Sequence, residues 1–408
     1  MTSSSAAGAR QPSAAASFPA LGQQVGGQPL AYLDSAATTL RPQAVINALA
    51  DFYATDNANP APVHALARRA ASRLTAARVT VARFINAPSP SEVIFTRGST
   101  EGINLIASTW GSANLRAGDE VILTIAEHNS NLLPWTRAAK QAGATVRVVD
   151  VDDGGRLRID QLKRFLSART RLVAFSHVSN VLGLVNPAKE ICLLARQAGA
   201  RVVIDGAQSV PHVSVDVQDL GCDFYVFSGH KTRGPMATGV VWGRLELLDA
   251  MPPYHVGSNM AHEVDFERST FEHGALKFQA GTPDVAGSVG LAAAIDFLAA
   301  MGKDATWRHD QELVRHGLAR LRELKGLRII GPTTPDERLP VFAFVIAGQS
   351  PPAIAAAMDA KGIAIRAGDM AALPLLKRFG VSEAARASAY VYSSRGDIDR
   401  LADALAQL

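Results

Sequence analysis

A lysine and an aspartate near the middle of the chain are the side chains best suited to covalent chemistry. Lys231 closes a polar turn after one apolar run, and Asp205 ends the apolar run before it. A lysine whose pKa is lowered by burial can form an imine with an aldehyde. A buried aspartate can keep the nitrogen of an aromatic ring protonated, which makes that ring an electron sink. The pair predicts a site for an aldehyde cofactor with a pyridine ring.

Three more polar segments supply the remaining groups of such a site. Residues 97–102 form a small polar turn that opens a helix and is suited to a phosphate. The ring of His128 can stack on the cofactor, and Asn180 and Gln208 can bind its ring oxygen. The predicted phosphate ligands are Ser99, Thr100, Ser228 and His230. Taken singly, these segments are ordinary turns, a helix cap or a solvated lysine. Together they predict pyridoxal 5'-phosphate (PLP) as the cofactor.

These segments have to be brought together by a sheet. Between about residues 90 and 245, short Val/Ile-rich runs alternate with helical patterns, which predicts parallel strands joined by right-handed crossovers. The runs are almost continuously apolar, as in strands buried on both faces. The strand candidates are residues 92–96, 120–124, 145–149, 172–176, 201–204, 224–227 and 239–242. Ligands bind beyond the carboxyl ends of such strands, where the polar segments stand.

The chain is long enough for one large and one small domain. Toward the C-terminus, strand and helix patterns mix in an order that predicts a small α+β domain, with a strand at 386–392. An Ala/Ser-rich transit peptide is an alternative for the N-terminus, which its single Arg disfavours. The expected division is a disordered tail at 1–17, a segment packing with the small domain at 18–40, a large cofactor-binding domain at 41–300 and a small domain at 301–408.

Composition and charge argue against several classes of protein. The formal net charge of +4 is spread along the chain without a basic run, so we expect no nucleic-acid partner. Cys192 and Cys222 lie far apart in no metal-binding pattern. No stretch approaches the roughly 20 apolar residues of a membrane helix. We therefore expect a cytoplasmic protein without a metal site or a membrane contact.

Consecutive motifs resemble those of the class V aminotransferase superfamily, and most of all its cysteine desulfurase and selenocysteine lyase branch. The motifs are LDSAAT (33–38), RGSTEGIN (97–104), EHNSN (127–131), HVSNVLG (177–183), DGAQS (205–209), SGHK (228–231) and AGTP (280–283). The resemblance runs from about residue 18 to the C-terminus. It implies the α/β fold of type I PLP-dependent transferases, with a mainly parallel seven-stranded sheet and a small α+β C-terminal domain.

The resemblance also implies the roles of several residues. Lys231 is expected to form the Schiff base and to act in catalysis together with His128. A homodimer with shared active sites is implied, in which Thr282 reaches the cofactor phosphate of the partner subunit. The substrate is then a small amino acid.

By the same resemblance, Arg366 and Arg386 are expected to clamp the α-carboxylate of that substrate. A guanidinium group suits this task because it meets a carboxylate with two parallel charge-assisted bonds. Two surface salt bridges are the alternative interpretation. Ala36 and Asn180 complete the expected substrate-binding residues.

The chain departs from this branch where a desulfurase needs its nucleophile. A desulfurase removes sulfur with a cysteine thiolate on a loop over the cofactor. In this chain the loop at 366–374 reads RAGDMAALP and has Ala371 where the cysteine is expected. Cys192 lies in a helical pattern and Cys222 precedes a strand, so we expect both to be buried structural thiols.

Two further departures concern the substrate side of the site. Ala65 follows His64 where relatives carry a basic residue. His255 lies in a segment that is a Gly-rich loop in relatives, and it is either a substrate contact or a surface histidine. The cofactor half of the motif set is intact, whereas the substrate half is altered.

An elimination needs no enzyme thiol when the leaving group departs unaided. We therefore expect a PLP-dependent lyase acting on L-cysteine or a cysteine-derived amino acid, in which Lys231 takes the Cα proton and a C–S, C–Se or C–SO2 bond breaks. An aminotransferase or epimerase is an alternative, because the cofactor performs the hard chemistry in each. A desulfurase with a cysteine placed elsewhere is another. A non-catalytic protein is disfavoured because it needs no Lys231 and Asp205 together.

Overall fold

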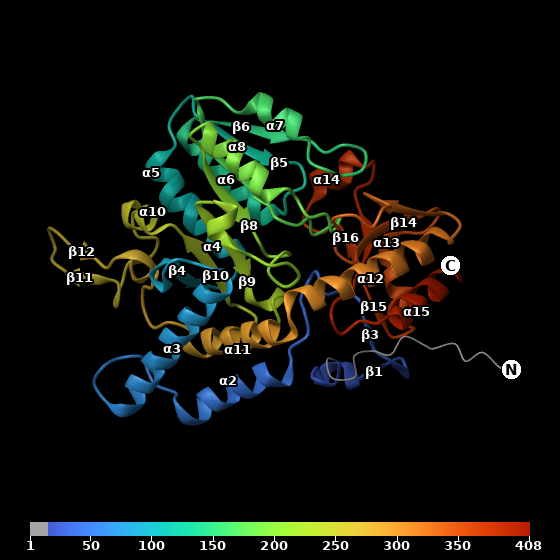
Figure 1. Cartoon of the computed structure of the whole chain (residues 1–408), viewed down its shortest axis with the longest axis horizontal. Helices are drawn as coiled ribbons and strands as arrows, with labels where there is room; N and C mark the ends of the chain where they lie inside the picture. Colours follow the sequence, from blue (N-terminus) through green and yellow to red (C-terminus); the bar gives the residue numbers. More distant parts are fainter. Residues whose placement is uncertain (1–14) are drawn as a thin grey trace.

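The computed structural model describes residues 15–408, which form two unequal layered parts side by side (Figure 1). The larger part holds a seven-stranded sheet among helices, and the smaller C-terminal part holds a four-stranded sheet. Most of the tail predicted at 1–17 lies outside the described residues. Its last three residues are structured, because the carbonyl oxygen of Ser17 accepts a hydrogen bond from the backbone N–H of Gln43.

The central sheet confirms the predicted mainly parallel arrangement of seven strands. Only β10 runs antiparallel to its neighbours, and the other pairings are parallel. The strands, in order across the sheet, are β4 (Val93–Thr96), β10 (Gly239–Gly243), β9 (Phe224–Ser228), β8 (Arg201–Asp205), β7 (Thr170–Ser176), β5 (Glu120–Thr124) and β6 (Thr145–Val149). The predicted bounds differ from these by no more than two residues.

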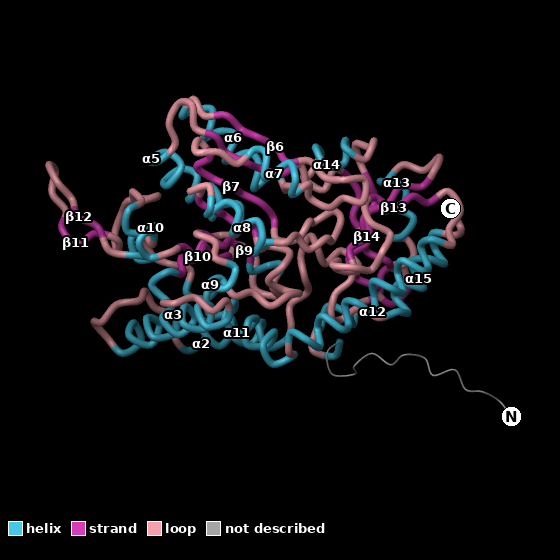
Figure 2. Tube along the Cα trace, turned by 45° about the horizontal axis from the view of Figure 1, so that its top comes forward, coloured by secondary structure: helices cyan, strands magenta, loops and turns pink. Residues whose placement is uncertain are grey.

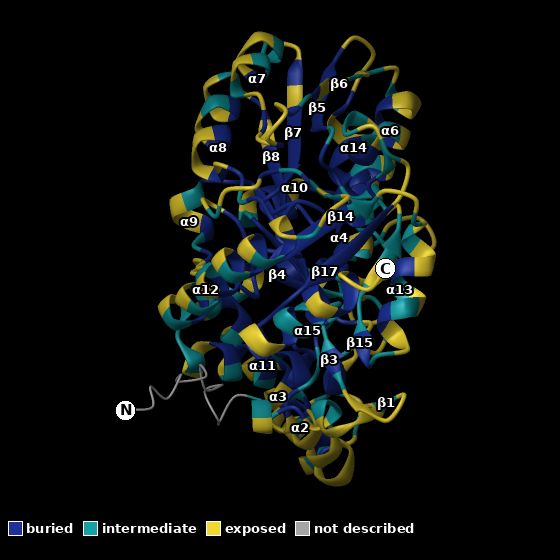
Figure 3. Ribbon diagram, turned by 90° about the vertical axis from the view of Figure 1, so that its right-hand side faces the viewer, coloured by how far each residue is buried: buried dark blue, intermediate teal, exposed yellow. Residues whose placement is uncertain are grey.

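The central strands are buried on both faces of the sheet. Along β5, Val121 and Leu123 belong to one hydrophobic core and Ile122 belongs to the other. The same alternation continues in β8, where Val203 lies in the first core. Figure 3 shows the inner strands as mostly buried. Because neither face is open to water, polar side chains are left to the ends of the strands.

Helices cover both faces of this sheet. They are α4 (Ser99–Ile106), α5 (Ser112–Asn114), α6 (Asn129–Ala142), α7 (Ile159–Phe165), α8 (Ala188–Gln197), α9 (Val217–Leu220) and α10 (Leu245–Ala250). A further layer is formed by α11 (Val285–Met301), which packs against α2 (Gln43–Thr55) and α3 (Ala65–Phe84) (Figure 1). Gly290 permits the close approach to α2, since a Cβ there would lie 3.0 Å from Cδ2 of Leu49.

The smaller part is built on an antiparallel sheet. Its strands, in order, are β13 (Leu327–Ile330), β14 (Val341–Ile346), β17 (Ala384–Ser388) and β16 (Arg366–Gly368), and its helices are α12 (Lys303–Arg322), α13 (Pro351–Asp359), α14 (Leu373–Arg378) and α15 (Arg395–Leu405). The strand predicted at 386–392 is wrong in its bounds. After Ser388 the chain leaves the sheet, because Ala389 donates its N–H to the carbonyl of Pro340 and both Tyr390 and Tyr392 join a separate aromatic core.

An N-terminal segment at 31–39, which we call the strap, joins the smaller sheet to the end of β9. Within it, β3 (Ala31–Tyr32) pairs in parallel with β15 (Ile363–Ala364). At its other end, the backbone N–H and the hydroxyl group of Thr39 each lie 3.0 Å from the carbonyl oxygen of His230. The strap therefore connects the two parts of the molecule at the place where they meet.

Two small hairpins complete the fold. They are β1 (Gln24–Val25) with β2 (Gln28–Pro29), and β11 (Ala261–Glu263) with β12 (Thr270–Phe271). The second hairpin projects away from the larger part (Figures 1 and 2), and Phe266 between its strands is fully exposed. Among the described residues, no single helix is long and apolar enough to cross a membrane, and α11 and α12 pass that test only as a pair bent by 77°.

Gly239 begins β10 directly beneath the turn at Gly98. A Cβ at this position would lie 2.4 Å from the Cα of Gly98, where no flexible side chain can give way. Gly239→Ala is therefore expected to lower the free energy of unfolding by about 1–3 kcal/mol, because overpacking has a cost of this size. Unfolding in urea measures the change. Gly22→Ala is the control, because a Cβ at Gly22 meets nothing within 4 Å. Equal stability of Gly239→Ala and wild type would show that the turn is free to shift.

Candidate active site

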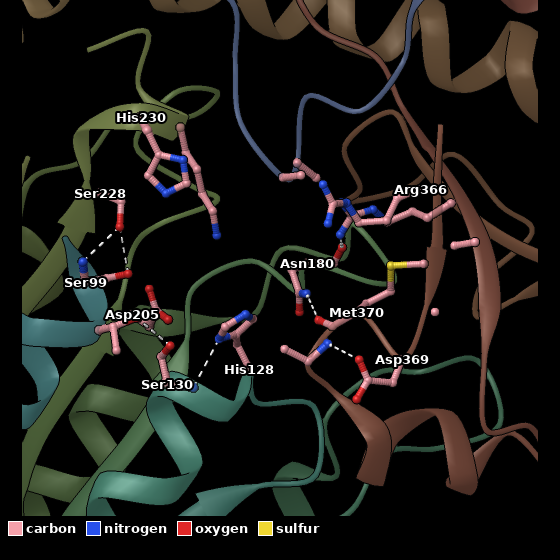
Figure 4. A pocket seen from close by; sticks show the side chains of 18 residues that line it. Ser99, His128, Ser130, Asn180, Asp205, Ser228, His230, Arg366, Asp369 and Met370 are labelled. Carbon is pink, nitrogen blue, oxygen red and sulfur yellow. Dashed lines mark hydrogen bonds between the residues drawn. The ribbon is translucent and has the colours of Figure 1, made fainter. Parts of the chain in front are cut away.

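One cavity of about 450 Å³ lies where the larger and smaller parts meet (Figure 4). It opens at the carboxyl ends of the central strands and is walled on the far side by β16 and the loop after it. All predicted site residues except Gln208 and Thr282 line it. They are Ala36, Ser99, Thr100, His128, Asn180, Asp205, Ser228, His230, Lys231, Arg366 and Arg386.

Lys231 ends a short 3-10 turn, Gly229–Lys231, directly after β9. The turn is held by the N–H of Gly229, which donates to the carbonyl oxygen of Thr238 at 2.8 Å. Burial lowers the pKa of Lys231, the charge of Asp205 opposes this shift, and the two arginines of the cavity add to it. A lowered pKa favours the neutral amine, which is the form that attacks an aldehyde.

Asp205 presents a buried carboxyl group at the end of β8. The residue is 5% exposed, and its Oδ1 accepts a hydrogen bond from the N–H of Ala207 at 2.9 Å. Burial raises its pKa, and the positive charge of Lys231 opposes the shift. Among residues 15–408, no Arg, Lys or His forms an ion pair with this carboxyl group. Such a group suits a ring nitrogen that becomes positively charged on protonation.

The turn after Asp205 is supported from below by Tyr225. The hydroxyl oxygen of Tyr225 lies 2.6 Å from the hydroxyl of Ser209 and 3.0 Å from Nδ1 of His177. Gly206 is required at this point, since a Cβ there would lie 2.1 Å from the ring of Tyr225. This buried network was not predicted, because its members belong to separate motifs.

An anion-binding turn forms where β4 passes into α4. Gly98 has φ = 146°, a conformation that favours glycine. The N–H of Ser99 donates to the hydroxyl of Ser228 at 2.8 Å, and the two hydroxyl oxygens are also 2.8 Å apart. The hydroxyl of Thr100 lies 2.7 Å from that of Ser130. Together with the first N–H groups of α4, these hydroxyls suit a phosphate.

His128 stands at the start of α6 with its ring in the cavity (Figure 4). Its Nδ1 accepts the N–H of Ser130 at 3.1 Å, so a neutral ring carries its proton on Nε2. Burial lowers the pKa of His128 to about 4, and the charges of Lys231 and Arg386 add to the shift. At neutral pH the ring is therefore uncharged, and it lines the cavity where it can stack on another aromatic ring.

Glu127 lies behind His128 and had no predicted role. It is 1% exposed and accepts hydrogen bonds from the hydroxyls of Thr124 and Ser176, each at 2.6 Å, and from the amide of Asn131 at 2.7 Å. Burial raises its pKa to about 7 against the opposing effect of these bonds. Because its partners come from β5, β7 and α6, Glu127 fixes the backbone that carries the histidine.

The two predicted carboxylate-binding arginines meet a single aspartate, Asp34. Nη2 of Arg366 lies 2.9 Å from Asp34 Oδ2, and Nη2 of Arg386 lies 3.2 Å from Asp34 Oδ1. Arg386 is buried and also donates from Nη1 to the carbonyl oxygen of Asn180 at 3.0 Å. The side chain of Arg366 is 48% exposed. The structure thus brings the arginines together in the cavity and pairs both with an internal carboxylate.

The loop that carries Ala371 is held against the cavity by its backbone. The amide of Asn180 donates to the carbonyl of Met370 at 2.9 Å, and the N–H of Asn129 donates to the carbonyl of Ala371 at 2.7 Å. Asp369 accepts the N–H of Ala371 at 2.9 Å. Met370 and Ala371 have φ of 53° and 51°, a left-handed conformation that costs a non-glycine residue about 1–2 kcal/mol. The bonds hold this strained segment as a wall of the cavity.

Several residues singled out in the sequence lie outside the cavity. The amide of Gln208 donates to the carbonyl of Ala36 at 2.7 Å. Thr282 is exposed shortly before α11, and its predicted contact with a partner subunit stays a prediction. His255 is exposed, with its ring stacked on Tyr254 at 4.1 Å between centroids.

Cys192 and Cys222 are both free and fully buried in the core on one face of the sheet. Burial raises the pKa of Cys192 to about 12 and that of Cys222 well above its usual value. In the part of the chain that the structure describes, no three His, Cys, Asp or Glu side chains are grouped so as to hold a metal ion. One cavity nevertheless brings together four groups that fit PLP. They are a buried amine, a carboxyl group without an ion-pair partner among the described residues, an anion-binding turn and a neutral imidazole.

Comparison with known proteins agrees with this fit. The family model described as aminotransferase class-V matches residues 31–401. The chain is 46% identical to a probable cysteine desulfurase of Halalkalibacterium halodurans, over 95% of each protein. It is 45% identical to a cysteine desulfurase of Synechococcus elongatus over 96% of this chain, and it spans 62% of the length of that relative.

Solved structures give the same result. A cysteine desulfurase from Escherichia coli in an S-sulfonic acid form is 37% identical, with a TM-score of 0.89 over 96% of each chain. An apo cysteine desulfurase from Thermococcus onnurineus is 32% identical, with a TM-score of 0.90 over 96% of this chain and 98% of that one. The chain therefore belongs to the class V aminotransferase family, in its cysteine desulfurase-like branch, and is a PLP-dependent enzyme.

Proposed function

We propose that the enzyme cleaves the carbon–sulfur bond of a cysteine-derived amino acid by β-elimination, without a persulfide on the enzyme. The observation that carries the proposal is Ala371, which lines the cavity on the loop where the resemblance places the cysteine of a desulfurase. None of the described residues that line the cavity is a cysteine. Cys192 and Cys222 are buried, and thiols with raised pKa supply almost no thiolate at neutral pH. A C–Se bond is open to the same elimination, with selenium leaving with its electrons.

Each residue of the cavity has one task in this reaction, which follows from its position. Arg366 and Arg386 bind the substrate through its α-carboxylate, and the amine of Lys231 takes the proton from Cα. Bound PLP supplies the electron sink for the charge left at Cα. Asp205 keeps the proton on the ring nitrogen, while the neutral ring of His128 covers one face of the site.

Atoms and electrons balance without a redox partner. The electron pair of the Cα–H bond forms a double bond between Cα and Cβ, while the Cβ–S bond breaks and sulfur leaves with its electrons. The enamine that is released hydrolyses to pyruvate and ammonia. No enzyme thiol takes part, which agrees with a cavity wall that carries a methyl group at Ala371.

We further propose a cytoplasmic homodimer with shared sites. Thr282 and His255 are exposed and lie outside the cavity of their own chain, and Phe266 is exposed on a projecting hairpin. Such positions suit contact with a second subunit. Thr282 then reaches the phosphate of the cofactor bound to that subunit. Both cysteines are free, as is usual in a reducing compartment.

S-Alkyl-L-cysteines are expected to yield pyruvate and a thiol without any reductant, in an assay that follows both products. Lys231→Ala should lower the rate on the order of 10³-fold, because it removes the group that takes the proton, and should abolish the absorbance band of the lysine-bound cofactor. Release of sulfide from L-cysteine that a thiol reductant accelerates would instead indicate a desulfurase. Conversion of the cofactor to its pyridoxamine form by an amino acid alone would indicate transamination.

Ala371→Cys is expected to add a reductant-dependent release of sulfide from L-cysteine. The loop bonds at Ala371 involve only its backbone, so the new thiol should take its place on the cavity wall. Sulfide is measured with and without dithiothreitol, before and after treatment with iodoacetamide. Ala371→Ser is the matched control and should add no reductant-dependent release of sulfide, since a hydroxyl does not form a persulfide. The contradicting outcome is that the two variants release the same amount of sulfide although iodoacetamide alkylates the new thiol at position 371. This position is then not that of a desulfurase nucleophile.

A further inference from the structure

Six consecutive residues, 366–371, line the active-site cavity and form one of its walls. Three of these residues have no side chain larger than a methyl group. Asp369 is exposed and is the one acidic residue of this wall. It lies outside the motifs that the chain shares with the cysteine desulfurase and selenocysteine lyase branch. The wall therefore offers space and one carboxylate to a ligand in the cavity.

Asp369 is fixed beside the place where the sulfur of the substrate is expected. Its Oδ1 accepts the N–H of Ala371 at 2.9 Å (Figure 4), and Ala371 stands where the resemblance places the residue that meets the substrate sulfur. Hydrogen bonds from Asn180 and Asn129 to the next two carbonyls hold this wall in place. A substituent on that sulfur is therefore expected within reach of the carboxylate.

The carboxylate of Asp369 has no cationic partner. Among residues 15–408, it forms no ion pair, and its Oδ2 accepts no hydrogen bond. Its charge nevertheless acts on the interior of the cavity. Burial is the main cause that lowers the pKa of His128, and the negative charge of Asp369 opposes this shift. The carboxylate thus presents an uncompensated negative charge to a bound ligand.

The other charged side chains that line the cavity each have a task in the proposed reaction. They are Lys231 and Asp205 for the cofactor, and Arg366 and Arg386 for the α-carboxylate of the substrate. The two histidines of the cavity are neutral at neutral pH, because burial lowers the pKa of His128 and of His230 to about 4. Asp369 is left for a charged group on the β-substituent, and such a group has to be a cation.

We propose that Asp369 makes the site selective for cysteine derivatives whose sulfur substituent carries a cationic group. The ammonium group of an S-aminoalkyl-L-cysteine is the simplest case, since it donates charge-assisted hydrogen bonds to a carboxylate. A substituent with a negative charge is repelled. The proposal rests on the proposed function for the cysteine-derived part of the substrate and adds the charge of the group that leaves.

L-Lysine and L-6-hydroxynorleucine test this selectivity, because they differ by one positive charge. They have the length of S-(2-aminoethyl)-L-cysteine and S-(2-hydroxyethyl)-L-cysteine, with a methylene group in place of sulfur, so no group can leave from Cβ. Their dissociation constants are measured on the PLP-loaded enzyme by calorimetry at neutral pH.

The wild-type enzyme is expected to bind L-lysine about fivefold more tightly at low salt, which is the upper range for an exposed ion pair. High salt should reduce this preference, because it screens the charge of the carboxylate. Equal binding at low salt, or tighter binding of the alcohol, would overturn the proposal. This measurement needs no variant.

Asp369→Asn is expected to remove the preference for L-lysine. The amide oxygen of the new side chain can still accept the N–H of Ala371, so the wall should keep its shape. Asp216→Asn is the matched control, because Oδ1 of Asp216 accepts the N–H of Gln218 at 3.0 Å, in the same two-residue pattern, outside the cavity. It should keep the ratio of the two dissociation constants.

A purely structural role for Asp369 predicts a different result. Asp369→Asn would then leave both ligands unaffected or weaken both by the same factor, and an unchanged ratio would overturn the proposal. Turnover is not needed for this test. If S-(2-aminoethyl)-L-cysteine yields no pyruvate but the ratio depends on Asp369, the elimination fails while the selectivity stands. If pyruvate forms and the ratio does not depend on Asp369, the reverse holds.

Discussion

Burial of the central sheet on both faces determines where the chemistry of this protein can take place. The faces of the sheet are closed by helices, so the polar side chains of the site stand where strands end. β8 and β9 are parallel neighbours, and they end at Asp205 and Ser228 in almost the same place. The carboxyl group and the lysine turn therefore meet at one edge before any side-chain detail is considered.

The strap extends this arrangement to the substrate. One short segment pairs with β15 through β3, bridges β17 at Asp34 between the two arginines, and ends at the carbonyl of His230. Hydrogen bonds of the strap therefore connect the smaller part to the turn that holds Lys231. They link the substrate end and the cofactor end of the cavity, although these ends belong to different sheets.

The cofactor half of the site was open to prediction because it depends on local patterns. An apolar run followed by a polar residue marks the end of a buried strand, and Asp205 and Lys231 were found in this way. The helix α3 was not assigned, since its buried face consists largely of alanines such as Ala67 and Ala70, which hardly stand out from the rest of the helix. A local pattern also set the wrong bounds for β17, where the change of direction depends on a distant carbonyl.

The substrate half depends on contacts between segments far apart in the chain. Asp34 stands in a motif, but its pairing with Arg366 and Arg386 follows from the register of β16 and β17 and from the path of the strap. The spacing of residues along the chain does not predict such a contact. Gln208 illustrates the same limit, because its amide is used by the carbonyl of Ala36 from the strap.

The loop at Ala371 has a consequence for how this fold diversifies. The hydrogen bonds that anchor Ala371 come from its own N–H and carbonyl, so its side chain contributes little to keeping the wall in place. A change of one side chain can then exchange a reactive group for an inert one while the surrounding architecture persists. The strained backbone of the loop keeps its place whichever side chain stands at position 371. Descendants of one ancestor can therefore acquire different reactions without first losing stability.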